Sequence, residues 1–182
     1  LQDIAQPKKQ IISSRSFGEA VTDLQDLKEA IASFVANACM KLRAQGGHAS
    51  MLQVFLQTNR FRKDQPQYMP VLAIPLSRPT SDTLAINRVA ASLCQQMWRS
   101  GYQYKKGGVV LSEITKACTA QEDWMTSNPE TNRLMHAVDN LNKRFGNMSI
   151  GLVGGIRTRS WSMKQKLKSP NYTTDWNEIA IA

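Results

Sequence analysis

The chain has 182 residues, enough for one ordinary domain or for a domain of about 100 residues with a small appendage. Hydrophobic residues make up 42% of it, which is sufficient for a core, and 23 basic against 14 acidic residues give a net charge of +9. This surplus favours a polyanionic partner, nucleic acid first and acidic protein or lipid next. The apolar runs are too short for a membrane span, so we expect no membrane contact.

Hydrophobic periodicity predicts six elements in the first two thirds of the chain. Apolar residues recur at three- and four-residue steps in two helices, the first capped by Thr22 or Asp23. They alternate with polar residues in the strands, most clearly at Leu52, Val54 and Leu56. In chain order, the predicted elements are a strand at 9–17, a helix at 23–45, strands at 49–58 and 68–76, a helix at 81–101 and a strand at 107–114.

The order β-α-β-β-α-β predicts an α+β fold, with a four-stranded sheet, both helices on one face and the other face open for contacts. A helix at 132–145 and a short strand at 148–153 predict a small α+β C-terminal module. Because the chain starts at Leu1 and not at Met, we expect a piece of a longer protein. The predicted divisions are a linker at 1–8, a main domain at 9–115, a linker at 116–131 and the module at 132–182.

Cysteine and histidine give no sign of catalysis. Cys39 and Cys94 fall on apolar helix faces, which predicts buried, reduced thiols in a cytosolic protein, and Cys118 is far from both. Neither His48 nor His136 has a partner at metal-ligand spacing, and no pair of aspartates suits two-metal phosphoryl transfer. A small hydrolase of this topology would need an anion-cradling loop beside a catalytic Asn or Arg, and the sequence offers none.

Basic and small residues gather at strand edges and in loops, which predicts contact with phosphate groups. The run from Lys9 to Gly18 offers hydroxyls and a guanidinium, and Gly107 and Gly108 would let main-chain amides approach a phosphate closely. The strands carry few aromatic residues, which favours gripping of a duplex backbone over stacking on bases. The predicted DNA contacts are Lys9, Ser14, Arg15, Ser16, Arg60, Arg62, Lys63, Lys105, Lys106 and Gly107.

Three segments resemble the C-terminal part of UmuC-type Y-family DNA polymerases, the catalytic subunits of DNA polymerase V. Residues 9–18, with the sequence SRSFG at their end, resemble the opening of the family's little-finger domain. Residues 101–111 look like its last strand, which a Tyr-basic-x-Gly-Val pattern introduces. Residues 161–175 are similar to the W-x-M-K/R … L-S-P-x-Y-T-T signature of the small C-terminal module. The three segments occur in the family's order and together span nearly the whole chain.

The resemblance implies that residues 9–115 are a little finger, joined by residues 1–8 to a thumb domain upstream. It implies no catalytic residue and no cofactor in this chain, with Mg²⁺ expected in the palm domain of a parent DNA-directed DNA polymerase, a nucleotidyltransferase. The implied function is non-catalytic DNA gripping and partner docking in error-prone translesion synthesis, as part of SOS mutagenesis and DNA repair. The implied location is the bacterial cytoplasm, at the nucleoid.

The partners implied by the resemblance are primer–template DNA, a sliding clamp, a UmuD′-like accessory dimer and a RecA filament. The family's clamp-binding peptide has a Gln, two variable residues, an aliphatic and an aromatic residue. In the matching place this chain has Gln121, Trp124 and Met125, with the last two types swapped; packing of Trp124 on its own domain is the alternative. In the C-terminal module, the contacts predicted with DNA or an acidic partner are Trp161, Met163, Lys164 and Tyr172.

Two other functions stay open on the sequence. A ferredoxin-like RNA-binding module would prefer single strands and would depend on Phe17, Phe55 or Tyr68. A basic protein-interaction adaptor would bind an acidic protein and no nucleic acid.

Overall fold

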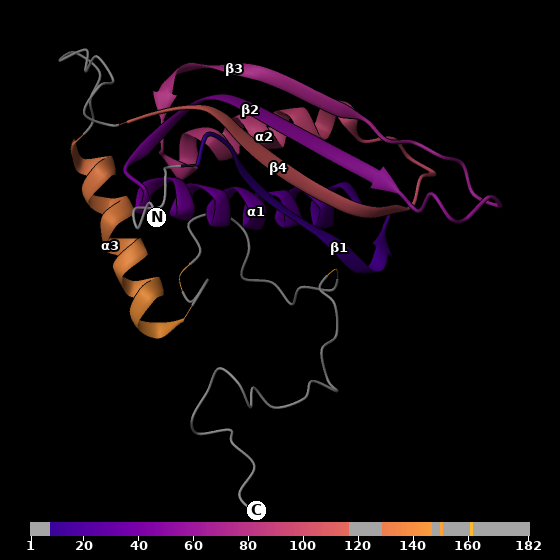
Figure 1. The fold of residues 1–182 in the computed structure, drawn as a ribbon. Helices are drawn as coiled ribbons and strands as arrows, with labels where there is room; N and C mark the ends of the chain where they lie inside the picture. Colours follow the sequence, from indigo (N-terminus) through magenta and orange to yellow (C-terminus); the bar gives the residue numbers. More distant parts are fainter. Residues whose placement is uncertain (1–7, 117–128, 147–149, 151–160, 162–182) are drawn as a thin grey trace, which may run out of the picture.

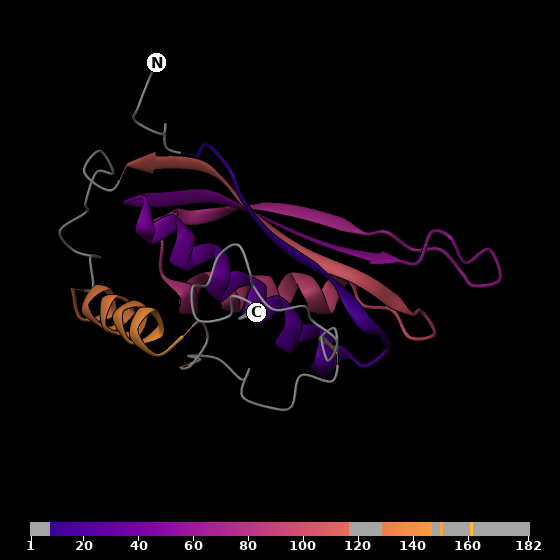
Figure 2. The same cartoon turned by 60° about the horizontal axis from the view of Figure 1, so that its bottom comes forward.

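The computed structural model describes residues 8–116, 129–146, 150 and 161 (Figure 1). Its four strands form one antiparallel sheet in the order β1-β4-β2-β3, and α1 and α2 cover one face of that sheet (Figures 1 and 2). The predicted α+β fold with both helices on one face is therefore confirmed. The elements are β1 (Ile11–Val21), α1 (Leu24–Ala44), β2 (Gly47–Thr58), β3 (Val71–Thr80), α2 (Thr83–Met97), β4 (Tyr104–Lys116) and α3 (Pro129–Phe145).

β4 is the last of the four strands in the sequence, but it lies inside the sheet, between β1 and β2. Ile11 pairs with Leu111 and Leu111 also pairs with Leu52, so the pairing runs straight across the three strands. Directly paired residues point to the same face of a sheet, and successive residues alternate between faces. The register therefore assigns each residue of β1, β4 and β2 either to the helix-covered face or to the open face.

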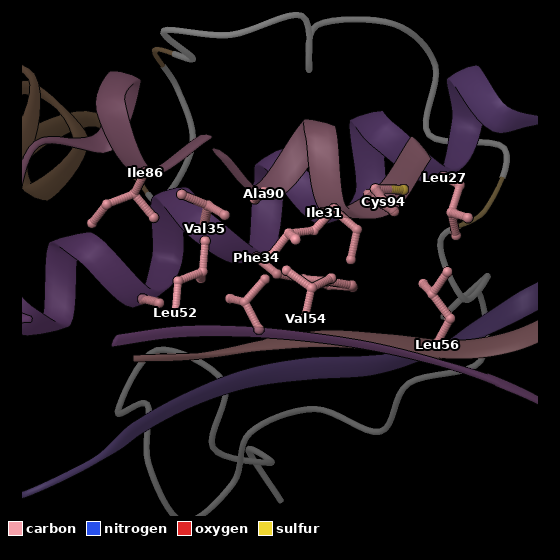
Figure 3. Close-up of a cluster of buried hydrophobic side chains, with 14 of the residues drawn as sticks. Leu27, Ile31, Phe34, Val35, Leu52, Val54, Leu56, Ile86, Ala90 and Cys94 are labelled. Atoms are coloured by element: carbon pink, nitrogen blue, oxygen red, sulfur yellow. The ribbon is translucent and has the colours of Figure 1, made fainter. Parts of the chain in front are cut away.

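The core lies between the sheet and the two helices (Figure 3). Leu52, Val54 and Leu56 of β2 point toward the helices, where Ile31 of α1 and Ile86 of α2 meet them, and all five are almost fully buried. Burying an aliphatic side chain of this size stabilises the fold by about 1.5–3 kcal/mol. The alternation read in residues 49–58 thus identifies the buried face of β2 correctly.

Both covering helices begin at an aspartate. The Asp23 carboxylate accepts hydrogen bonds from the main-chain N–H groups of Gln25 (2.8 Å) and Asp26 (3.2 Å), so Asp23 and not Thr22 caps α1. The Asp82 carboxylate accepts from the N–H of Leu84 at 2.8 Å and caps α2. Each cap satisfies donors that the first helical turn leaves without partners, which fixes where the helices start below the sheet.

Several strands are longer than the sequence predicts. β1 does not end at residue 17 but continues to Val21, and β4 begins at Tyr104 instead of residue 107. β3 does not end at residue 76 but continues through Pro79, because it is an edge strand and a proline there need not donate to a neighbour. The early start of β4 places Lys105 and Lys106 inside a strand instead of in the turn before it.

The buried face of α3 differs from the predicted one. The helical spacing of Leu134, Val138, Leu141 and Phe145 predicts that they share one buried face, but Leu134, Leu141 and Phe145 are 45%, 38% and 65% exposed. Val138 is buried together with Met135 and Asn142. Polar contacts are made from this same side of α3: the Asp139 carboxylate accepts from Arg43 Nε and Nη2 at 2.6 and 2.7 Å, and Asn142 exchanges two hydrogen bonds with the main chain of Ile150.

Cys39 and Cys94 are free thiols in the core, as predicted. Burial raises the pKa of each thiol to about 12, because the uncharged form is favoured away from water. Cys118 lies outside the described residues, as does most of the strand predicted at 148–153.

Candidate nucleic-acid interface

Basic side chains converge at one end of the sheet. The register places Ser16 beside Lys106 and Lys106 beside Gln57, and β2 then continues into a loop, residues 59–70, that projects beyond the sheet (Figures 1 and 2). Glu19 and Asp64 are the acidic residues described at this end of the sheet. We call this region the basic end; its cations are Arg15, Arg60, Arg62, Lys63, Arg99, Lys105 and Lys106.

The two glycines of β4 serve opposite faces. A Cβ atom on Gly107 would meet the ring of Phe17 at 3.2 Å and Leu56 at 3.3 Å, so this glycine faces the core. A Cβ atom on Gly108 would meet Ser14 at 2.3 Å and the ring of Phe55 at 2.7 Å, on the open face. Neither glycine presents a bare main chain to solvent; both allow neighbouring side chains to close over β4.

The polar residues of β1 are likewise divided between the two faces. Ser14 and Ser16 pair with Gly108 and Lys106 and share the open face with them. Arg15 pairs with Gly107, so it extends from the opposite side of this edge strand, where it is exposed. Ser16 and Lys106 can therefore reach one phosphate group together, whereas Arg15 approaches an anion from the rim of the sheet.

The middle of the open face is apolar. Ile12 and Val71 are 55% and 53% exposed there, around a half-buried Phe55. The cations that could contact phosphates lie at the basic end and not across the whole face. The predicted contact Lys9 is exposed but precedes the other end of β1, so it lies apart from the basic end.

Lys105 is already engaged by the protein itself. Opposite β2, the residues paired with Gln57 and Thr58 are Lys106 and Tyr104, which leaves Lys105 as the extra residue of a bulge in β4. Its ammonium group donates to the carbonyl of Gly18 at 2.9 Å. Lys105 therefore ties the last part of β1 to β4, in addition to adding positive charge.

A single amide group organises the 59–70 loop. Gln67 Nε2 donates to the carbonyl oxygens of Arg62 (2.8 Å), Asn59 (3.0 Å) and Gln65 (3.2 Å), and its Oε1 accepts from the hydroxyl of Thr58 at 3.1 Å. The loop is thus wrapped around one side chain. This arrangement holds Arg60, Arg62 and Lys63 out from the sheet in a defined shape.

Arg99 is the basic residue that the sequence reasoning missed. Its guanidinium lies 4.5 Å from the centre of the Tyr68 ring, and Tyr68 packs on Tyr102 at 5.0 Å between ring centres. Gln65 adds a hydrogen bond of 3.3 Å to Gln103, which ties the loop to the segment before β4. In the sequence, the only local indication of this role is that Arg99 lies between Trp98 and Tyr102, just after a helix.

Phe17 is not available as a stacking platform. It is 1% exposed, stacks on Phe34 and meets the edge of Trp161 at 6.1 Å between ring centres. An RNA-binding module on this sheet would have to rely on Phe55 and Tyr68.

Trp161 lies against the main domain. Its ring is 7% exposed and contacts the rings of Phe17 and Phe34, and its carbonyl accepts a hydrogen bond of 3.0 Å from the N–H of Gly18. Met163, Lys164 and Tyr172 lie outside the described residues, and so do the predicted clamp contacts Gln121, Trp124 and Met125. Those six assignments stay predictions.

In the part of the chain that the structure describes, no three His, Cys, Asp or Glu side chains gather in a way that could hold a metal ion. None of the helices there combines the length and the apolar character needed to cross a membrane.

Comparison with known proteins decides the family. The model of the impB/mucB/samB family C-terminal domain matches residues 8–124, which include the whole sheet and both covering helices. The chain belongs to the impB/mucB/samB family. A second model, for a domain of unknown function (DUF4113), matches residues 132–182.

The relatives of this impB/mucB/samB-family chain include a UmuC protein, the type that its sequence motifs resemble. It is 32% identical to Protein UmuC of Salmonella typhimurium over 98% of its length, and 33% identical to Protein MucB of Escherichia coli over all of it. In both cases it spans 43% of the relative's length. The resemblance to UmuC-type proteins is confirmed.

Solved structures similar to the chain include an insertion ternary complex of Dbh DNA polymerase, with a TM-score of 0.47 at 13% identity, covering 62% of this chain and 32% of that one. A complex of the beta-clamp processivity factor with the little finger domain of PolIV has a TM-score of 0.39 at 12% identity, covering 57% of this chain and 86% of that one.

Proposed function

We propose that this chain is the DNA-gripping and partner-docking part of an error-prone translesion DNA polymerase. The observation that carries the proposal is the basic end, where cations from β1, β4 and two loops lie at the same end of the sheet. Contacts to phosphates fix the position of a protein on a duplex without reading its sequence. A grip of that kind tolerates a damaged or distorted template, which suits synthesis across lesions.

The arginines of the 59–70 loop suit phosphate contact. Arg62 is 60% exposed, and its ion pair with Asp64 spans 3.9 Å between two exposed groups. An exposed pair of this kind contributes about 0–1 kcal/mol, so a phosphate can replace the carboxylate at little cost. A guanidinium can also bind two phosphate oxygens at once, which orients the backbone as well as attracting it.

The test is fluorescence anisotropy of the chain on primer–template duplex at several salt concentrations. Because Lys105 also bonds to Gly18, the variant Arg15→Ala/Arg62→Ala/Lys106→Ala isolates the phosphate contacts better than one that includes Lys105. We expect weaker binding to every duplex sequence and a salt slope reduced by roughly 0.9 for each phosphate that the variant no longer neutralises.

The matched control is Arg88→Ala/Lys143→Ala/Arg144→Ala, which removes the same charge from exposed positions on α2 and α3. The control should keep the salt slope of the unaltered chain. If both triple variants lose affinity equally, net charge and not the basic end is responsible. Absence of binding to any duplex would move the function to a protein partner.

The proposal extends to the parent protein and its partners. The parent would be a DNA-directed DNA polymerase that binds Mg²⁺ in a palm domain and acts in SOS mutagenesis with a UmuD′-like dimer and a RecA filament. A sliding clamp would bind at Gln121, Trp124 and Met125. Loss of clamp binding in a Gln121→Ala/Trp124→Ala variant, with duplex binding kept, would support the clamp assignment; unchanged clamp binding would remove it.

A further inference from the structure

The 59–70 loop carries an aromatic ring that the fold does not use. Phe61 is 87% exposed, more than any other large apolar side chain among the described residues. It stands between Arg60 and Arg62, with Lys63 next in the chain, and all three are exposed. A single exposed apolar side chain is ordinary, but a ring surrounded by three cations at the tip of a projecting loop combines two kinds of contact.

The loop holds the main chain at Phe61 in place. The main-chain N–H of Phe61 donates to the side-chain oxygen of Asn59, two residues earlier, at 3.1 Å. The Gln67 amide bonds to the carbonyls on both sides of the tip, and the Gln65 and Tyr68 contacts tie the base of the loop to the segment before β4. Because the loop is shaped before any ligand arrives, little ordering cost remains when the ring makes a contact.

Unpaired DNA offers both contacts that the tip can make. Its phosphates attract cations, and each unstacked base presents a flat aromatic face, on which stacking is independent of sequence. An apolar pocket on a protein would accept the ring but would gain nothing from the three surrounding cations unless it were acidic. A fully paired duplex keeps its bases stacked inside, where the ring cannot reach them.

We propose that Phe61 stacks on an unpaired DNA base, so that the tip of the 59–70 loop senses single-stranded DNA next to the duplex that the basic end holds. The inference rests on the proposed DNA-gripping function. Arg60, Arg62 and Lys63 hold the phosphates beside that base, and Gln67 keeps the shape of the loop that carries the ring. The site has no base specificity, because stacking needs only the flat face.

The experiment compares two DNA probes by anisotropy at fixed salt: a blunt, fully paired duplex and the same duplex with a single-stranded extension carrying 2-aminopurine. Phe61→Ala should lower the affinity for the extended duplex by about 10-fold, within the range for removal of one stacked base, and leave the blunt duplex unchanged. In the unaltered chain, stacking of Phe61 should quench the 2-aminopurine fluorescence of the extended duplex. Phe61→Ala should abolish this quenching, whereas Phe61→Trp should keep both the affinity and the quenching. The salt slope should not change, because the variant keeps every charge.

Phe145→Ala is the matched control, since it removes another exposed phenylalanine, 65% exposed, from α3. It should bind both probes as the unaltered chain does. Equal binding of both probes by Phe61→Ala and the unaltered chain would overturn the inference and leave the DNA-gripping function standing. Failure of the unaltered chain to bind either probe would overturn both.

Discussion

Lys105 and Lys106 are neighbours in sequence, yet the structure gives them different roles. Lys106 lies on the open face beside Ser16, where its ammonium group can meet a phosphate. Lys105 occupies a bulge and donates to the carbonyl of Gly18, which holds the end of β1 against β4. Two adjacent basic residues in a sequence are therefore not two equal candidates for phosphate contact.

The buried thiols of Cys39 and Cys94 predict a loss of stability at alkaline pH. Their pKa values are raised from 9.0 to about 12, mainly by burial. Above pH 9 the unfolded chain releases these protons while the folded chain keeps them, so the stability present at neutral pH is lost as pH rises from 9 toward 12. At about pH 10, each thiol should lower the free energy of unfolding by about 1 kcal/mol relative to neutral pH.

Urea unfolding at pH 8 and pH 10 measures this effect. The unaltered chain should lose more unfolding free energy between the two pH values than a Cys39→Ala/Cys94→Ala variant does. Comparing the pH-dependent difference removes the cavity cost of the substitutions themselves, which is the same at both pH values. Parallel losses in the two proteins would show that the thiols are not the titrating groups.

At the scale of elements, the packing between β1, β4 and β2 depends on two adjacent glycines of different tolerance. In Gly108→Ala the new Cβ would lie 2.3 Å from the Cβ of Ser14, so main chains must move, and we expect a loss of about 1–3 kcal/mol. In Gly107→Ala the nearest atom is the Phe17 ring at 3.2 Å, and a smaller loss should follow. Urea unfolding midpoints of the two variants measure both losses. Equal losses would contradict the difference in space around the two glycines.

The sequence predicts the elements and the core because burial repeats with the period of each element. Leu52, Val54 and Leu56 are identified by alternation alone, without knowledge of any neighbour. Strand ends are harder to predict, because Pro79 is tolerated only where β3 is an edge strand, and the position of a strand in the sheet is not a local property.

The candidate interface is only partly predictable, since the register of three strands assembles it. The basic runs are visible in the sequence, but their convergence depends on the pairing of Ser16 with Lys106 and of Lys106 with Gln57. Arg99 joins them through its packing on Tyr68, which no sequence spacing reveals. The predicted buried face of α3 was wrong, and the contacts made by its actual inner face are not local in sequence: the Arg43–Asp139 ion pair links positions 96 residues apart.

At the scale of the whole molecule, Trp161 links the part of the chain matched by the second family model to the core of the main domain. Its ring closes over Phe17 and Phe34. Trp161→Ala should lower the free energy of unfolding by about 3–5 kcal/mol, the usual cost of truncating a buried aromatic side chain. Trp161→Phe should lose less; a Trp161→Ala chain as stable as the unaltered one in urea would mean that this packing contributes nothing.

The interior position of β4 has a consequence for synthesis on the ribosome. β1 pairs only with β4, from which Leu111 reaches back to Ile11 across 100 residues of chain, whereas β2 and β3 can form a hairpin as soon as both have emerged. Until β4 leaves the exit tunnel, the nascent chain has no second strand against which β1 can settle, and its edges stay open to other chains. The basic end draws on β1 and β4 as well as on the 59–70 loop, so it is complete only after β4 has joined the sheet.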